Sequence, residues 1–165
     1  MSAAELFEDA RWRETPALIE LVLERFHAVH RQEFPEAQRL AEAVERQHTT
    51  HEACPIGLLD LLALIADELE HHQQKEEVVL FPLMLAGGHP MISGPIQRML
   101  MDHHDLELQL AEMIHLTQAF QAPVDACSKW RHLYKACAKL HADLSLHMKI
   151  ENELLFPRFA QERAA

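Results

Sequence analysis

An eleven-residue pattern occurs twice in this chain, in the same internal register. HQQKEEVVLFP covers residues 72–82, and HMKIENELLFP covers residues 147–157. Each copy places a histidine four residues before a glutamate and ends in Leu-Phe-Pro. Residues four apart in an α-helix lie one turn apart on the same face, so each copy presents an imidazole beside a carboxylate. The sequence therefore predicts two helices that each carry such a pair.

The composition favours helix along most of the chain. Only four of the 165 residues are glycine, and the long runs of Ala, Leu, Glu, Gln and Arg are typical of helices because these side chains lose little freedom there. Since 48% of the residues are apolar, a chain of this length can bury one sizeable core. These features predict a single all-α domain.

Turn signals divide the chain into four long helices. The breaks are at residues 48–55, 87–90 and 121–125, where Gly, Pro and short polar residues gather. Helices of this length with short connections most simply form an up-down-up-down four-helix bundle. The expected helices cover residues 16–47, 56–85, 93–120 and the stretch from after 125 to 159. We expect a bundle over residues 15–160, an N-terminal extension at 1–14 and a C-terminal tail at 161–165.

Charge and residue counts narrow the function. A formal charge of −11 disfavours nucleic acid and anionic membranes as partners, because no basic face is available to neutralise phosphates. Thirteen histidines favour metal binding, since imidazole is the commonest metal ligand. Three cysteines without a C-x-x-C pair, no apolar signal core and no membrane-length apolar run predict a soluble cytoplasmic protein.

The repeated pattern predicts a dinuclear metal site. Carboxylates from two helices can bridge two cations, with histidines completing each position, and mixed nitrogen and oxygen ligands favour iron, manganese or zinc. Counting residues from the turns places one histidine of each helix at one depth, provided that two longer connections absorb a mismatch of about seven residues. The candidate ligands are His27, His72, Glu76, His104, His147 and Glu151.

Several other residues near this layer have open roles. His103 remains an alternative to His104, because the rotation of the third helix is determined only to one residue. His48 would lie about 20 Å from the layer, so we do not include it. Glu68 and Asp143 each precede a helix histidine by four residues, and they are either outer hydrogen-bond acceptors, the lining of an access channel, or surface acids. The remaining histidines, including His30, are expected at the surface or rim.

Motifs outside the repeat match one known family. They are Arg25-Phe-His27, Val44-Glu-Arg-Gln-His48, Glu68-Leu-Glu-His-His72, Gly94-Pro-Ile96, His104-Asp105 and Ala126-Cys-Ser-Lys-Trp130. Together with the repeat, this set resembles the hemerythrin-like domain of the repair-of-iron-centres proteins, which are bacterial di-iron proteins linked to nitric-oxide and oxidative stress.

The resemblance implies an oxo- and carboxylate-bridged centre of two iron ions on the same six residues. His48 matches a histidine of the family that is sometimes counted as a ligand. Full-length members carry a small N-terminal domain with a cysteine pair, which is not expected in the roughly fifteen residues that precede the bundle here.

The function implied by this resemblance is that of a non-haem di-iron stress protein. Such a protein binds or reacts with NO or O₂, or supplies iron for the repair of iron–sulfur clusters, with apo iron–sulfur proteins as partners. The alternative is a hemerythrin-like module that binds or senses O₂ or NO without chemistry, and a third reading is a helical bundle with incidental histidines. No nucleophile or phosphate-binding loop is evident, so a hydrolase or transferase is not expected.

Overall fold

The structure, a computed structural model, describes residues 1–160. No strand occurs among them, which confirms the all-α prediction. The tail expected at 161–165 lies outside the described residues. The elements are α1 (Ala3–Arg11), α2 (Thr15–Leu21), η1 (Val22–His27), α3 (Ala28–Gln47), α4 (Leu58–Lys75), η2 (Glu76–Leu80), α5 (Phe81–Leu85), α6 (Ser93–Leu116), α7 (Ser128–Ile150), η3 (Glu151–Leu155) and η4 (Phe156–Phe159). Of these, η1, η2 and η3 are π-helical and η4 is a 3₁₀-helix.

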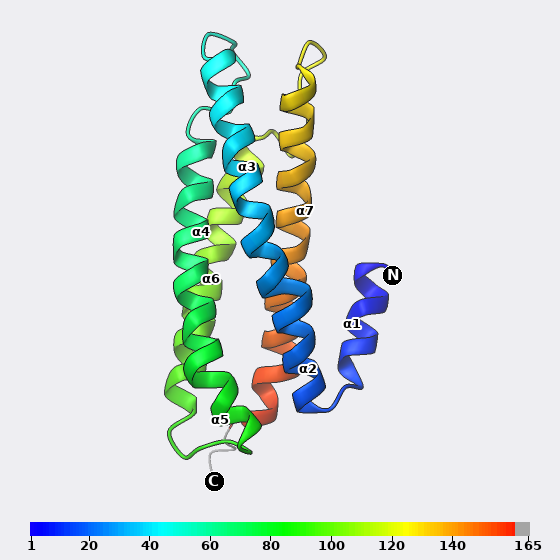
Figure 1. Cartoon of the computed structure of the whole chain (residues 1–165), viewed down its shortest axis with the longest axis vertical. Helices are drawn as coiled ribbons and strands as arrows, with labels where there is room; N and C mark the ends of the chain where they lie inside the picture. The colour runs from blue at the N-terminus through cyan, green and yellow to red at the C-terminus, as the bar shows by residue number, and fades with distance from the viewer. Residues whose placement is uncertain (161–165) are drawn as a thin grey trace.

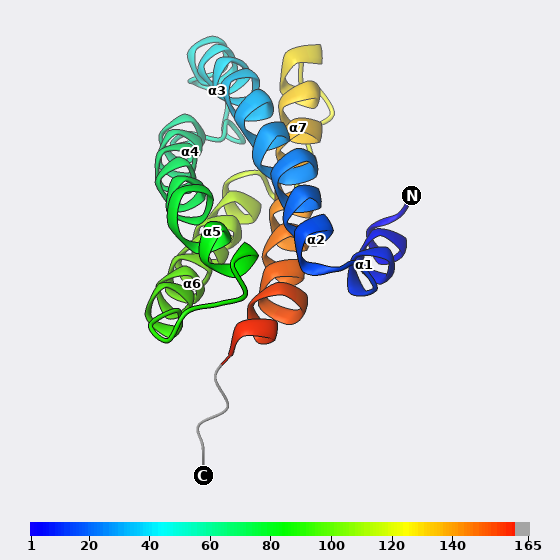
Figure 2. The same ribbon diagram turned by 60° about the horizontal axis from the view of Figure 1, so that its bottom comes forward.

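Consecutive elements join into long helical stretches that lie side by side (Figure 1). α3 packs against both α4 and α7, and α6 packs against the same two helices. The chain colours in Figure 1 show that neighbouring stretches run in opposite directions. Figure 2, turned by 60°, shows α1 outside this group, next to α2 and α7. None of the helices in the described part of the chain combines the length and apolar character that a bilayer crossing needs.

The apolar core is divided into two clusters along the length of the molecule. One cluster surrounds Trp130, Leu62 and Met113, and the other surrounds Phe26 and Phe81. On the first three long stretches, a short and mostly polar segment separates the residues of one cluster from those of the other, whereas on α7 the two clusters meet between Leu144 and Ile150. The divided core therefore leaves a buried layer in which polar side chains from all four stretches can meet.

The N-terminal extension forms a helix of its own, α1. Its start is stabilised by a reciprocal capping box, in which the Ser2 side chain accepts from the backbone of Glu5 and the Glu5 side chain accepts from the backbone of Ser2. Phe7 is buried in the second core cluster, and the Lys149 Nζ atom of α7 lies 4.5 Å from the centre of its ring. Burial of this one aromatic ring anchors α1 to the side of α7.

The third long helix ends at Leu116, four residues earlier than the sequence suggested. Thr117 causes this end, because its hydroxyl donates to the Met113 carbonyl at 2.8 Å and accepts the Phe120 N–H at 3.2 Å. The three residues after it have positive φ angles, which a continuing right-handed helix does not allow. Local side-chain hydrogen bonding thus outweighs the helical preference of the apolar residues that follow.

The assignment of residues to the core predicts that substitution of two leucines has very different effects on the free energy of unfolding. Leu140 is fully buried whereas Leu108 is 60% exposed, so Leu140→Ala should lower the free energy of unfolding by about 2–5 kcal/mol. Leu108→Ala should change it by less than about 0.5 kcal/mol. Urea denaturation with a chelator present measures both values, and equal effects of the two substitutions would contradict the assignment.

Candidate metal centre

The polar layer between the two core clusters contains four histidines and two glutamates. They form two groups of possible ligand atoms, and within each group the atoms lie within 4.8 Å of one another. All six side chains are buried, and both glutamates are fully inaccessible to solvent. The first group is His27, Glu76, His147 and Glu151, and the second is His72, Glu76, His103 and Glu151. Both glutamates therefore belong to both groups.

Each glutamate directs its two oxygens toward different histidine pairs. Glu76 places Oε2 at 3.3 Å from His27 Nε2 and Oε1 at 3.3 Å from His72 Nε2. Glu151 places Oε1 at 2.9 Å from His147 Nε2 and Oε2 at 3.0 Å from His103 Nε2. Each group thus consists of two imidazole nitrogens and one oxygen from each carboxylate. A carboxylate shared in this way is the arrangement that bridges two metal ions.

Three π-helical segments position ligand candidates. His27 is the last residue of η1, whereas Glu76 and Glu151 are the first residues of η2 and η3. The Phe81 N–H donates to the Glu76 carbonyl, and the Phe156 N–H donates to the Glu151 carbonyl, each five residues back. Such single π turns inside α-helices are frequent at functional sites.

The Leu-Phe-Pro ends of the repeat explain where two of these π turns lie. Pro82 lies in the first turn of α5 and Pro157 in the first turn of η4. A proline lacks the N–H that would continue the α-helical bonding, and it is tolerated where a helical segment begins. The π turn before each proline therefore lets the helix restart, and the repeated sequence determines the placement of both glutamates.

The outer nitrogen of each histidine also has a partner. His27 Nδ1 lies 2.8 Å from Glu77 Oε1, and His72 Nδ1 lies 3.3 Å from Asp102 Oδ2. His103 Nδ1 lies 2.7 Å from Asn152 Oδ1. An oxygen acceptor at Nδ1 keeps the proton there and leaves Nε2 free to bind a metal. The fourth outer nitrogen, His147 Nδ1, lies 3.2 Å from Nε2 of another buried histidine, His30.

The two glutamates are ionised despite their burial. Burial and the charge of Glu151 oppose ionisation of Glu76, but the neighbouring His72 and His27 outweigh them and lower its pKa. Burial likewise opposes ionisation of Glu151, and contacts with His147 and His103 lower its pKa well below the ordinary value. Two negative charges at this depth require positive charge beside them.

The hydrogen-bonding state of these atoms fits a bound cation. Both oxygens of Glu76, Oε2 of Glu151 and Nε2 of His27 have no hydrogen-bond partner among the described residues, although nitrogen and oxygen face each other at close range. His72 Nε2 and His103 Nε2 are only 3.2 Å apart. Nitrogen and oxygen atoms crowded together with so few hydrogen bonds are suited to metal coordination once the histidines lose their protons, and this set of donors suits iron, manganese or zinc.

The histidines of the layer differ in their affinity for protons. Burial opposes protonation of His72, but Glu76 and Glu151 outweigh it and raise its pKa to about 9. The pKa values of His27 and His103 are also raised by the glutamates against the effect of burial, whereas burial lowers the pKa of His147. A cation must therefore displace protons from these histidines, so metal binding weakens on acidification.

The structure brings together five of the six ligands expected from the sequence and replaces the sixth. His104 is exposed and belongs to neither group, whereas the preceding residue, His103, points into the layer. Successive residues in a helix are rotated by about 100°, so an error of one residue in the rotation of α6 exchanges the buried histidine for the exposed one. The expected placement of His104 is corrected to His103.

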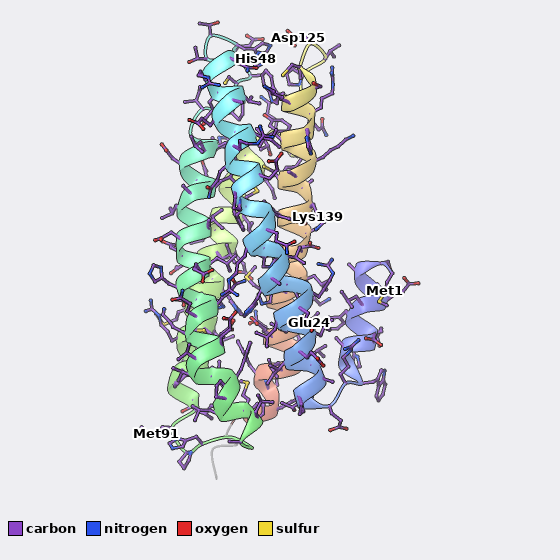
Figure 3. The ribbon with its side chains drawn as sticks, viewed as in Figure 1. Met1, Glu24, His48, Met91, Asp125 and Lys139 are labelled. Atoms are coloured by element: carbon purple, nitrogen blue, oxygen red, sulfur yellow. The ribbon has the colours of Figure 1, made fainter. Side chains whose placement is uncertain are left out.

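His48 lies apart from the centre, as the residue count suggested. Its Nε2 atom is 3.3 Å from Cys127 Sγ, and Figure 3 shows it at the same end of the molecule as Asp125. Glu24, which precedes His27 by three residues, lies in the opposite half of the molecule (Figure 3). The structure therefore gives His48 a packing role at the end of the helices.

The two acids with open roles are in different surroundings. Glu68 lines a cavity of about 290 Å³ that also contacts His72, His103 and Asp102. Asp143 instead pairs with Arg25 at 3.0 Å and with Lys139 at 2.8 Å. Glu68 therefore borders a cavity that reaches two histidines of the centre, whereas Asp143 belongs to an ion-pair network that links α7 to η1.

Sequence reasoning missed the outer partners of the histidines and the burial of His30. One signal for His30 was available, because it follows His27 by three residues and so shares its helix face. The partners Glu77, Asp102 and Asn152 directly adjoin ligand candidates in the sequence. Neighbours in sequence point in different directions around a helix, so their contact with other helices is visible only in three dimensions.

The fold and this pair of histidine–glutamate groups are those of a cation-binding helical domain. Residues 19–159 match the family model described as the hemerythrin HHE cation binding domain. The chain belongs to this family.

The chain is also similar to curated proteins named iron-sulfur cluster repair protein YtfE. It is 42% identical to the one from Musicola paradisiaca over 157 residues, which cover 94% of this chain and 71% of that protein. It is 43% identical to the one from Dickeya chrysanthemi over 137 residues, which cover 83% of this chain and 62% of that protein. The protein from Yersinia pseudotuberculosis is 40% identical over 149 residues, covering 89% and 67%. The chain thus spans roughly two thirds of the length of these relatives.

The adjacent histidines of α6 provide a matched test of the site. His103→Leu should lower the iron content of the purified protein, because it removes one nitrogen of the second group. His104→Leu should retain the wild-type content, and so should His48→Ala. Elemental analysis of the three variants purified from the same iron-replete cells measures this, and the opposite ranking of His103 and His104 would refute the assignment.

The Asp143 network predicts a pH-dependent contribution to stability. Burial opposes ionisation of Asp143, but Arg25 and Lys139 outweigh it and lower its pKa. A carboxyl whose pKa is lower in the folded state stabilises the protein above its unfolded pKa of about 4, and the contribution disappears as the pH falls through the folded value. Because both cations are partly exposed, we expect about 1 kcal/mol at pH 7.

Urea denaturation of wild type and Asp143→Asn, both with chelator, measures this contribution between pH 7 and pH 3. The difference in free energy of unfolding between the two proteins should shrink toward zero below about pH 4. A difference that stays constant across this range would show that the carboxylate charge does not stabilise the fold.

Proposed function

We propose that this chain holds two iron ions and acts in the repair of iron–sulfur clusters during nitric-oxide and oxidative stress. The observation that carries the proposal is the shared pair of glutamates: the two oxygens of Glu76 face His27 and His72, and those of Glu151 face His147 and His103. The family match to a cation-binding domain and the names of the relatives support iron as the metal.

In the proposed centre, His27 and His147 would hold one iron and His72 and His103 would hold the other. Glu76 and Glu151, which belong to both groups, would be shared between the two. Bound iron would supply redox and Lewis-acid chemistry toward NO or O₂. The protein orients the imidazoles through their outer partners, excludes water with the core clusters on both sides, and holds the carboxylates ionised.

The arrangement of the helices is part of the same proposal. We assign residues 15–160 to an up-down-up-down four-helix bundle with residues 1–14 as an extension that carries α1. The packing of α3 and α6 against both α4 and α7 supports this assignment. Side chains on facing helices build metal sites in the core of such a bundle, and each of the four long stretches here supplies one of the four imidazoles.

The cavity beside the second histidine pair favours iron supply over gas binding alone. Its lining mixes apolar side chains with charged ones of both signs, among them Glu68 and Asp105, and it contacts both His72 and His103. Carboxylates along such a route can relay a hydrated cation, whereas a site that only binds a diatomic gas requires a dry apolar pocket. In the proposed function, apo iron–sulfur proteins receive iron by this route. A module that binds or senses O₂ or NO without chemistry is the alternative.

Metal analysis combined with transfer assays tests the proposed function. Wild type should contain about two irons per chain, with a visible spectrum that changes on anaerobic exposure to NO, and it should restore cluster absorbance in an apo iron–sulfur protein. Glu68→Leu should retain iron and its spectrum but slow the transfer. Glu76→Leu and Glu151→Leu should each lose both irons.

The outcomes separate the candidate functions. Two irons that respond to NO but are never transferred would favour the gas-binding module. No iron, or a single tightly held zinc, would contradict the proposed centre. If Glu68→Leu transferred iron as fast as wild type, the cavity would not be the route by which iron leaves the centre.

A further inference from the structure

The outer partners of the four histidines are not alike. Three of them are oxygen atoms, from Glu77, Asp102 and Asn152. The fourth is the imidazole of His30, whose Nε2 lies 3.2 Å from His147 Nδ1. His30 is 1% exposed and belongs to neither group of possible ligands. A fifth buried histidine therefore occupies the place that an acid or amide takes at the other three positions.

The position of His147 determines the direction of this hydrogen bond. Its Nε2 lies 2.9 Å from Glu151 Oε1 and so faces the centre. A histidine that binds metal through Nε2 carries its remaining proton on Nδ1. Nδ1 of His147 then donates to Nε2 of His30, and His30 carries its own proton on Nδ1.

Packing holds the His147 ring in this orientation. Phe26 stacks on it, with ring centres 5.1 Å apart and planes 12° from parallel. The ring of His30 lies 5.3 Å from that of His147, with planes 26° apart. Phe26 and His30 are both supplied by the first long helical stretch, so that stretch controls the tilt of an imidazole that belongs to α7.

We propose that His30 is a positioning residue for the metal centre, which accepts the Nδ1 proton of His147 and so fixes the tautomer and orientation of that ligand. The inference rests on the proposed metal centre. It assigns a role to a residue that does not itself bind the metal, and it predicts that iron affinity depends on a hydrogen-bond acceptor at position 30.

The far side of His30 opens toward the surface. Its Nδ1 has no hydrogen-bond partner among the described residues, and neither has Nε2 of the buried Gln73. Both residues line a cavity of about 150 Å³ between α3 and α4, together with Phe34 and Glu70. Removal of the His30 ring would enlarge this cavity up to His147, so a small heterocycle from solution can take the place of the ring.

Substitutions at position 30 show whether iron binding depends on a hydrogen-bond acceptor there or only on the bulk of the side chain. His30→Leu keeps the bulk but removes the acceptor, and it should weaken iron binding about 10- to 100-fold. His30→Gln offers a carbonyl oxygen and should restore most of the affinity. His141→Leu, on the same helix as His147 but outside both groups, is the control and should leave affinity unchanged. Competition with a chelator, followed by the visible spectrum, measures all four proteins.

Two further readouts distinguish positioning from stability. In the presence of chelator, His30→Leu should stay folded with a free energy of unfolding close to that of wild type, because loss of the unpaired Nδ1 of His30 offsets the loss of the acceptor for His147 Nδ1. Imidazole should restore iron binding in His30→Ala, whereas pyrrole, which offers an N–H but no acceptor nitrogen, should not. Wild type with imidazole controls for direct binding of imidazole to iron.

A measurement on the unmodified protein tests the inference even if the variants do not fold. In the zinc-loaded protein, proton–nitrogen NMR should find His147 protonated at Nδ1 and His30 protonated at Nδ1. Protonation of His30 at Nε2, or unchanged iron affinity in His30→Leu, would overturn the role. Complete loss of one iron in His30→Leu would instead make His30 a ligand. If wild type itself bound no metal, the proposed function would fail first.

Discussion

The rest of the structure depends on the burial of two ionised glutamates. Glu76 and Glu151 are fully inaccessible to solvent, and carboxylates at this depth are stable only beside positive charge. The four histidines that surround them come from all four long helical stretches. The same contacts that neutralise the carboxylates therefore join the helices, and the two apolar clusters on either side keep water away from them. A site of this kind makes the fold and its metal interdependent.

The centre is organised as two similar halves with different surroundings. One half, with His27 and His147, is backed by Glu77 and His30. The other, with His72 and His103, is backed by Asp102 and Asn152 and borders the cavity lined by Glu68. Each half has one imidazole with a carboxylate behind it and one with a neutral partner. An anionic partner makes an imidazole a stronger donor, so each metal position combines a stronger and a weaker histidine.

Much of the site was predictable from the sequence, because its periodicity coincides with the helix. The repeat correctly indicated that Glu76 and Glu151 lie together, since a spacing of four residues is preserved in any helical context. The structure turns His103 rather than His104 into the layer, because two adjacent histidines differ in helix rotation, which the packing of α6 against α4 and α7 decides. The π turns were not foreseen, although a proline six residues after each glutamate was an available signal for η2 and η3. The burial of His30 depends on its contact with His147, which is 117 residues away in the sequence.

Anomalous diffraction at the iron absorption edge tests the central claim most directly. The account predicts two peaks inside the bundle, one beside His27 and His147 and the other beside His72 and His103, with Glu76 and Glu151 reaching both. A single peak, or peaks that do not share the two glutamates, would contradict it.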